Sequence, residues 1–171
     1  MSVVNRYSNF LICVGLGIGQ GFQPVASFNY QARKYDRVKK GLVFTMCFGL
    51  VFIGSFSVIS MICAEGIIGI FQKSEAVIAI GSTALRYTVI GMLFFPFSVP
   101  VNMLYQSIQQ PTISSVLSLI RSGAVTIPML LIGVPLLGLP GIQIAQPTAD
   151  VIAGLLSIPF IIRFLRKTPA E

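Results

Sequence analysis

Long uncharged stretches are the feature that most constrains how this chain folds. Residues 7–32, 41–64, 87–120, 122–149 and 151–162 contain no Asp, Glu, Lys or Arg. A helix needs about 20 apolar residues, each adding about 1.5 Å, to cross a hydrocarbon core about 30 Å thick. The sequence therefore predicts an all-α, polytopic integral membrane bundle. Its five transmembrane helices are expected at about residues 7–28, 41–63, 82–108, 112–137 and 141–163.

The composition excludes an ordinary soluble domain. Only 10% of the 171 residues are charged and 54% are hydrophobic, whereas a soluble domain carries about 25% charged residues. These few charges cannot cover the chain with a water-facing surface, so lipid must be the solvent for most of it. A cleaved signal peptide does not explain the first stretch, because four further stretches follow it and it is rich in Gly and Gln.

Basic residues are concentrated on one side of the predicted spans. That side is formed by a loop expected at residues 29–40 and by the tail, and its basic residues are Arg33, Lys34, Arg37, Lys39, Lys40, Arg163, Arg166 and Lys167. The other side holds Arg6 and Lys73, with Arg86 near the start of the third span. By the positive-inside rule the richer side is cytoplasmic, so we expect a plasma-membrane protein with its N-terminus outside and its C-terminus inside. This asymmetry explains the net charge of +7 without a nucleic-acid partner.

Four glycines stand at every second position in "GLGIGQG", namely Gly15, Gly17, Gly19 and Gly21. They do not form a dinucleotide-binding loop, because Gln20 or Phe22 occupies the place of the third glycine in G-x-G-x-x-G. On a helix, the first and third glycines form one G-xxx-G pair, and the second and fourth form another. Such pairs let a second helix approach closely, either for static packing or as a sliding surface.

Two stretches resemble one transporter family. The stretch "GIGQGFQPVASFNYQARKYDRVKK", residues 17–40, is similar to the end of the eighth helix and the following cytoplasmic loop of multidrug and toxic compound extrusion (MATE) transporters, in their bacterial branch. The stretch "SLIRSGAVTIPMLLIGVPLLGLPGIQIAQPTAD", Ser118–Asp150, resembles the eleventh and twelfth helices. The resemblance covers essentially the whole chain. One departure is Gln31, where the family usually has glycine, and it predicts a changed turn into the loop.

The resemblance implies both a function and a missing part. MATE transporters have twelve helices in two lobes that rock about a central cleft, and they export xenobiotics in exchange for Na⁺ or H⁺. By resemblance, residues 1–171 supply helices eight to twelve of the C-terminal lobe. The expected partners are a missing N-terminal lobe, the lipid bilayer and small organic cations, with a coupling ion and no other cofactor. The alternatives are a lipid-linked substrate flippase of the same superfamily and a non-transporting membrane fragment.

No residue pattern supports an enzyme or a metal site. The chain has no His and no G-x-S-x-G elbow. Cys13, Cys47 and Cys63 show no C-x-x-C spacing, so we interpret them as small core residues rather than metal ligands. In the MATE family the coupling acids lie on the first, seventh or tenth helix. This chain has no acid between Glu75 and Asp150, so no coupling carboxylate carries over onto it.

The third predicted span, "FFPFSVPVNMLYQSIQQ", is unusually polar. Pro96 and Pro100 predict a kink, because each removes a backbone donor. Beyond it, Asn102, Gln106 and Gln109 follow a spacing of four and then three, so they are expected on one face. The side chains on that face either form hydrogen bonds to another helix or line a water-filled substrate cleft.

Three more polar residues are predicted deep in the membrane. Gln20 must face protein or a wet cavity, and we assign it to the substrate cleft with Asn102 and Gln106. Arg121 and Asp150 are expected about 15 and 20 Å from the cytoplasmic ends of their spans. A charge at a helix centre costs at least about 2.5–3.5 kcal/mol, which favours a buried ion pair between Arg121 and Asp150. In the alternative interpretation, Arg121 faces the cleft.

Overall fold

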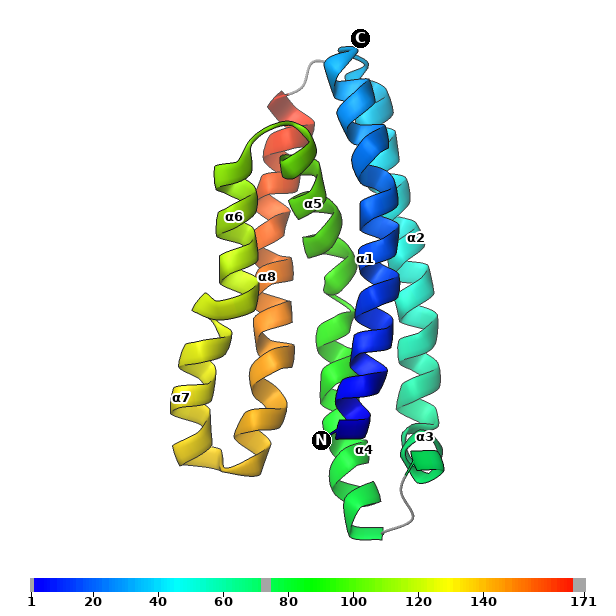
Figure 1. The fold of residues 1–171 in the computed structure, drawn as a ribbon, viewed down its shortest axis with the longest axis vertical. Helices are drawn as coiled ribbons and strands as arrows, with labels where there is room; N and C mark the ends of the chain where they lie inside the picture. The colour runs from blue at the N-terminus through cyan, green and yellow to red at the C-terminus, as the bar shows by residue number, and fades with distance from the viewer. Residues whose placement is uncertain (1, 72–74, 168–171) are drawn as a thin grey trace.

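The computed structural model describes residues 2–71 and 75–167, and this part of the chain folds as an antiparallel helical bundle without strands (Figure 1). Lys73, counted above among the outer charges, lies outside these ranges. The helices are α1 (Ser2–Gln31), α2 (Tyr35–Ile62), α3 (Ala64–Phe71), α4 (Glu75–Met92), α5 (Phe95–Ser107), α6 (Pro111–Leu119), the π-helix η1 (Ile120–Ala124), α7 (Thr126–Leu137) and α8 (Leu139–Lys167). The α1–α2 turn lies at the same end of the bundle as the end of α8, and the α7–α8 turn lies at the opposite end (Figure 1).

The all-helical prediction is confirmed, but not every predicted span is one continuous helix. Within the described residues, α1, α2 and α8 are each long and apolar enough to cross a membrane. A fourth crossing is counted if α4 and α5, which are bent by 45° at a short break, form one span. The fourth predicted span, residues 112–137, is divided into α6, η1 and α7. The short helix α3 was not predicted.

The bend between α4 and α5 lies before the two prolines and not between them. The break falls at Leu93 and Phe94, and Pro96 occupies the first turn of α5. Proline has no N–H to bond the carbonyl of Met92, and its ring disfavours helical backbone in the residue before it. Pro100, in contrast, lies inside α5. The predicted kink is therefore present, and it is associated with Pro96.

Both flanking helices continue into residues 29–40, which were predicted as a cytoplasmic loop. Only residues 32–34 separate α1 from α2. Arg33 adopts a left-handed conformation with φ of 58°, and the Lys34 N–H donates to the Asn29 carbonyl at 2.9 Å. These features close a tight helix C-terminus. Gln31, where a glycine was expected, is simply the last helical residue of α1.

Only one of the two glycine pairs lies in a helix contact. A Cβ added at Gly15 would lie 2.6 Å from Phe95 Cε1, and one added at Gly19 would lie 2.8 Å from Val99 Cγ1. Both contacts are with α5. At Gly17 and Gly21 an added Cβ would meet no described atom within 4 Å. Gly15 and Gly19 thus allow α1 and α5 to approach closely, as the G-xxx-G spacing predicts.

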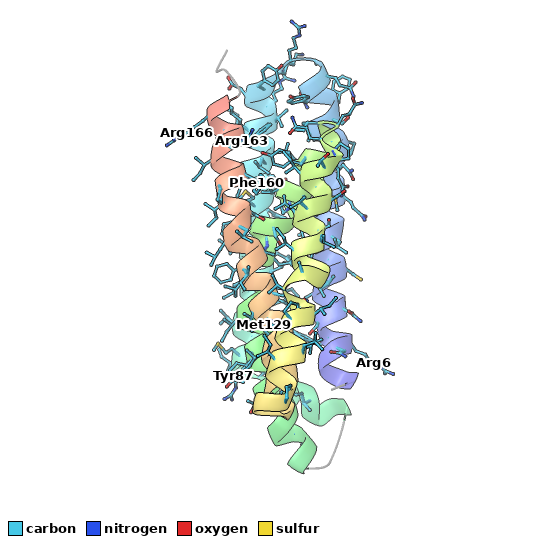
Figure 2. All side chains as sticks on the ribbon, turned by 90° about the vertical axis from the view of Figure 1, so that its left-hand side faces the viewer. Arg6, Tyr87, Met129, Phe160, Arg163 and Arg166 are labelled. Atoms are coloured by element: carbon cyan, nitrogen blue, oxygen red, sulfur yellow. The ribbon has the colours of Figure 1, made fainter. Side chains whose placement is uncertain are left out.

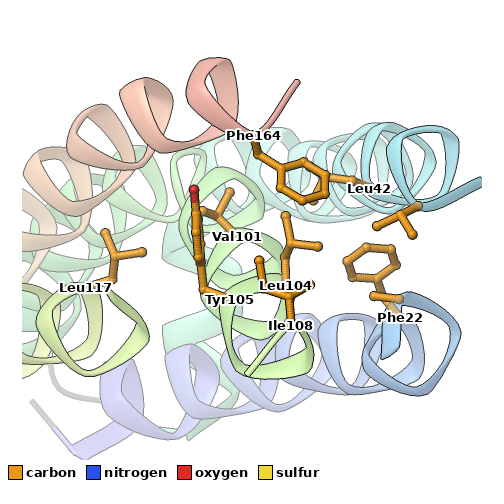
Figure 3. Packing of buried hydrophobic residues seen from close by; sticks show 10 residues of the cluster. Phe22, Leu42, Val101, Leu104, Tyr105, Ile108, Leu117 and Phe164 are labelled. Atoms are coloured by element: carbon orange, nitrogen blue, oxygen red, sulfur yellow. The ribbon is translucent and has the colours of Figure 1, made fainter. Parts of the chain in front are cut away.

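A buried cluster joins five helices near the α1–α2 turn (Figure 3). Its members are Phe22, Ala26, Val38, Leu42, Val101, Leu104, Tyr105, Ile108, Leu117 and Phe164. The Tyr105 hydroxyl also donates to the Phe160 carbonyl at 3.1 Å, which connects α5 to α8. The cluster fixes α5, with its polar face, in the middle of the bundle.

The outside of the bundle is apolar. Large side chains such as Phe44, Ile62 and Leu131 are 69%, 77% and 71% exposed, and Arg163 and Arg166 lie near one end, far from Arg6 (Figure 2). A surface of this kind suits lipid and not water. The cysteines were expected in the core, but all three are free and exposed. Their small, weakly polar side chains are compatible with a lipid-facing position.

Candidate functional site

A chain of hydrogen-bonded amides connects α1, α5 and α6. Asn102 Nδ2 donates to Ser118 Oγ at 2.5 Å, and Ser114 Oγ donates to Asn102 Oδ1 at 2.5 Å. Gln106 Nε2 donates to the same Asn102 oxygen at 3.0 Å. Gln23 Nε2 then donates to Gln106 Oε1 at 3.3 Å. Because neither lipid nor apolar packing can satisfy an amide, the bonds of the partly buried Asn102 determine which faces of α5 and α6 meet.

The predicted polar face of α5 is real for Asn102 and Gln106 but not for Gln109. Asn102 is partly buried between α5 and α6 and bonded on both sides of its amide, so it fills the interhelical role. Gln106 is exposed. Gln109 lies beyond the end of α5 at Ser107, with φ of 57°. The helical spacing that placed it on this face stops applying there.

Helix α1 carries a matching stripe of amides. With 100° of rotation per residue, Asn5, Asn9, Gln20 and Gln23 fall within about 60° of one another around the helix axis. Gln20 is exposed and makes no hydrogen bond to the others within the described residues. The side of α1 opposite the stripe carries the exposed apolar residue Val25. The sequence thus separates a polar face of α1 from a lipid face.

Arg121 projects from the π-helix η1. The extra residue in this turn is marked by the Val125 N–H, which donates to the Ile120 carbonyl five residues back at 3.3 Å. Such bulges re-aim side chains and are frequent at functional sites. The guanidinium carbon of Arg121 lies 4.3 Å from the centroid of the Phe95 ring, in cation–π geometry. The sequence predicts a continuous helix here, and Gly123 alone does not indicate the bulge.

The structure brings Arg121 and Asp150 together. Arg121 Nε lies 3.5 Å from Asp150 Oδ1, and the two side chains are 23% and 7% exposed. The distance is long for a hydrogen bond, and within the described structure Asp150 Oδ1 has no hydrogen-bond partner. The pair is therefore electrostatic and incomplete. Arg121 bridges α5 and α8, and Gln20 is not part of this contact.

The sequence of this lipid-facing bundle matches a known family. The MatE family model matches residues 1–132 of the chain. The chain is a member of the MatE family. The resemblance noted in the sequence is confirmed, and MatE proteins are transporters rather than enzymes. No curated protein matches the sequence.

Three solved structures are similar to this MatE chain. One is a MATE in complex with MaL6, with a TM-score of 0.87 over 96% of this chain and 38% of that one. The others are inward-facing and outward-facing conformations of a multidrug resistance MATE transporter of the MOP superfamily. Their TM-scores are 0.81 and 0.82, over 97% and 96% of this chain and 40% and 38% of theirs. All three are 18% identical to it, so they show a shared fold. The chain spans about two fifths of their length.

Proposed function

We propose that this MatE chain forms the larger part of the C-terminal lobe of a multidrug exporter, which exchanges its substrate for Na⁺ or H⁺. In this proposal the chain crosses the membrane five times, as helices eight to twelve of the family. A second lobe, on the same or a separate chain, covers the polar face of α1 and α5. The substrates are small organic cations.

The observation that carries the proposal is the exposed amide surface formed by Gln20 and Gln106. The Gln106 amide is bonded to Gln23 and Asn102, while Gln20 lies one turn from Gln23 on the same side of α1. Exposed amides on a lipid-facing surface would each forfeit hydrogen bonds at a cost of several kcal/mol. A water-filled cleft between two lobes removes that cost, and amide groups at its edge offer oxygen acceptors to a cationic substrate.

A comparison of the two transporter conformations supports movement of the lobe as one unit. The chain matches the inward-facing and outward-facing structures almost equally, with TM-scores of 0.81 and 0.82. If the lobe itself were rearranged between these states, one match would be clearly worse. In the proposed cycle, this bundle therefore rocks against its partner lobe.

The test is drug export by Gln20→Ala and Gln106→Ala variants of the intact protein, in a host that lacks other exporters. Both changes remove an exposed amide without opening a core cavity, so expression should stay normal while the relative resistance to several cationic dyes and drugs changes by at least about threefold, equivalent to about 0.7 kcal/mol of binding. The matched control is Gln31→Ala. Gln31 is also exposed on α1 but lies at its end, and among the described residues its side chain bonds to Ser27 of the same helix.

Asn102→Ala provides a contrast. Because Asn102 is bonded to Ser114 and Ser118, its loss should lower the amount of folded protein and reduce export of all substrates in parallel. Unchanged export per molecule in both Gln20→Ala and Gln106→Ala would show that these amides do not line the cleft.

A further inference from the structure

A cavity of about 160 Å³ lies at the basic end of the bundle, where α1, α5 and α8 all end beside the turn that leads into α6 (Figure 1). Its polar lining consists of Tyr30, Tyr105, Gln110 and Arg163. None of these residues belongs to the amide network described above. A single water needs only about 10–15 Å³ of such space, so the cavity has room for a group of several atoms.

Arg163 gives the cavity its charge. Among the described residues that line the cavity, it alone carries a charged side chain. In the described part of the chain its guanidinium has neither a carboxylate partner nor a hydrogen bond. A guanidinium presents five N–H donors in a fork that matches the oxygens of a phosphate. The exposed Arg163 therefore keeps its donors for a ligand, and that ligand is an anion.

Two uncharged side chains add donors next to this charge. The Tyr30 ring packs edge-to-face on Tyr35, with centroids 5.4 Å apart, and this contact positions the Tyr30 hydroxyl. Gln110 precedes the first turn of α6 and makes no capping hydrogen bond with its side chain, so its amide is available. The Tyr105 hydroxyl is directed towards α8 (Figure 3) and donates to the Phe160 carbonyl, so Tyr105 serves as a fixed wall. The positive end of the α6 dipole adds to the attraction for an anion.

The surroundings of the cavity suit a lipid headgroup. The cavity lies at the end of the bundle that the charge pattern predicts to be cytoplasmic. Leu156 lies seven residues, or about two turns, before Arg163, so both lie on the same face of α8, and Leu156 is 41% exposed. On α6, Val116 follows Ile113 by about one turn and is 46% exposed. Both helices thus continue from the cavity into the membrane with apolar surface, which a free anion would not use and an acyl chain would cover.

We propose that this cavity binds the phosphate group of an anionic phospholipid from the cytoplasmic leaflet. The phosphate oxygens accept hydrogen bonds from Arg163, Tyr30 and Gln110, and the acyl chains lie along α6 and α8. One bound lipid thereby connects α1 and α8 to the α5–α6 turn. Anionic lipids are enriched in this leaflet, and basic pockets between helices on that side recognise their headgroups. The inference goes beyond the proposed function and depends on neither the substrate nor the coupling ion.

The experiment measures the thermal unfolding of the intact protein in lipid nanodiscs by circular dichroism. Phosphatidylglycerol replaces phosphatidylcholine in steps at constant ionic strength and pH. The wild type should show a saturable rise in Tm of about 2–5 °C, because a ligand that binds the folded state stabilises it. Arg163→Gln should raise the phosphatidylglycerol fraction at the midpoint of this rise by at least about threefold, through loss of a charge-assisted hydrogen bond.

Arg166→Gln is the matched control for the charge. It removes the same charge from the same helix at a residue that is also exposed, one turn further on, and Arg166 is not among the described residues that line the cavity. The phosphatidylglycerol midpoint of this variant should stay close to that of the wild type.

A second pair of variants tests the hydroxyl without changing any charge. Tyr30→Phe keeps the ring that packs on Tyr35 but removes a donor from the cavity, so it should raise the phosphatidylglycerol midpoint at least about twofold. Tyr35→Phe removes a hydroxyl from the other ring of the same pair. Because Tyr35 is not among the described lining residues, this variant should leave the midpoint unchanged.

Three results would overturn the site. The first is a wild-type Tm that does not depend on phosphatidylglycerol. The second is an equal shift of the midpoint within either pair of variants, as expected of diffuse attraction between the basic end and an anionic surface. The third is a rise in Tm in phosphatidylcholine nanodiscs with inorganic phosphate that equals the rise with phosphatidylglycerol, which would make the ligand a soluble anion and not a lipid. The drug-export test at Gln20 and Gln106 uses none of these residues, so failure of this site and failure of the proposed function are distinguishable.

Discussion

Replacing Gly15 with alanine should destabilise the protein, while the same change two residues later should not. A Cβ at Gly15 would lie 2.6 and 2.9 Å from Phe95 ring atoms and 3.3 Å from Ile53 Cδ1. Both neighbours are buried, with 2% exposure each, so the ring cannot move aside freely. Overpacking of this kind costs about 1–3 kcal/mol, and the gain from replacing a helical glycine offsets about 0.5–1 kcal/mol. The expected net loss is therefore about 0–2.5 kcal/mol, with a midpoint near 1 kcal/mol.

Gly17→Ala is the matched control. An added Cβ there meets no described atom within 4 Å, so only the gain from helix propensity remains, at most about 1 kcal/mol. The free energy of unfolding would be measured for each variant by titration with sodium dodecyl sulfate in mixed micelles. The two substitutions should change it in opposite directions.

A double variant tests the cause of the Gly15 effect. Phe95→Leu shortens the side chain that a Cβ at position 15 would contact. In the Phe95→Leu background, Gly15→Ala should therefore lower the free energy of unfolding by at least about 0.5 kcal/mol less than in the wild type. Two results would refute the packing of α1 on α5 through this face. One is an equal loss of unfolding free energy for Gly15→Ala and Gly17→Ala. The other is a loss for Gly15→Ala that is the same in the Phe95→Leu background as in the wild type.

Three further predictions follow from contacts and from the charge pattern. Gly91→Ala should destabilise by about 3 kcal/mol in the same titration, because its Cβ would lie 2.6 Å from the Cα of Pro147, and backbone cannot yield as a side chain can; a loss below about 1 kcal/mol would contradict the α4–α8 contact. Tyr105→Phe should lower the free energy of unfolding by about 1 kcal/mol through loss of its bond to the Phe160 carbonyl, and no change would mean that the bond contributes nothing. In a cysteine-free background, Lys34→Cys should react with a membrane-impermeant thiol reagent only after the cells are opened, whereas labelling of intact cells would reverse the orientation.

The helices were predictable because their signals are local. Each uncharged stretch is long enough to satisfy its own backbone in lipid, so α1, α2 and α8 follow from composition along the chain. The predictions were wrong where a helix ends or where a π-helix interrupts it. Gln109 was expected on the face of Asn102, but α5 ends at Ser107. The π-helix around Arg121 also changes the rotation that a regular helix would give.

The glycines of α1 show what the sequence can predict about the contact between α1 and α5 and what it cannot. Two overlapping pairs predicted close helix contact, and residues two apart lie about 200° apart around a helix, so only one pair can face a given neighbour. The sequence could not say which. Packing of α5 against Gly15 and Gly19 decided it, and this leaves Gly17 and Gly21 on the open side of α1.

The sequence by itself determined that this chain is a membrane bundle of the MATE type, with a basic end and polar residues held inside. Lipid imposes this, because it penalises every charge and every unpaired backbone group wherever it stands in the chain. The sequence also predicted the pairing of Arg121 with Asp150. Only the tertiary structure decided that Asn102 meets the serines of α6 and that a cavity lies beside Asp150. The physical reason is that these contacts depend on how helices remote in sequence cross and rotate, and shape complementarity between packed side chains sets that crossing.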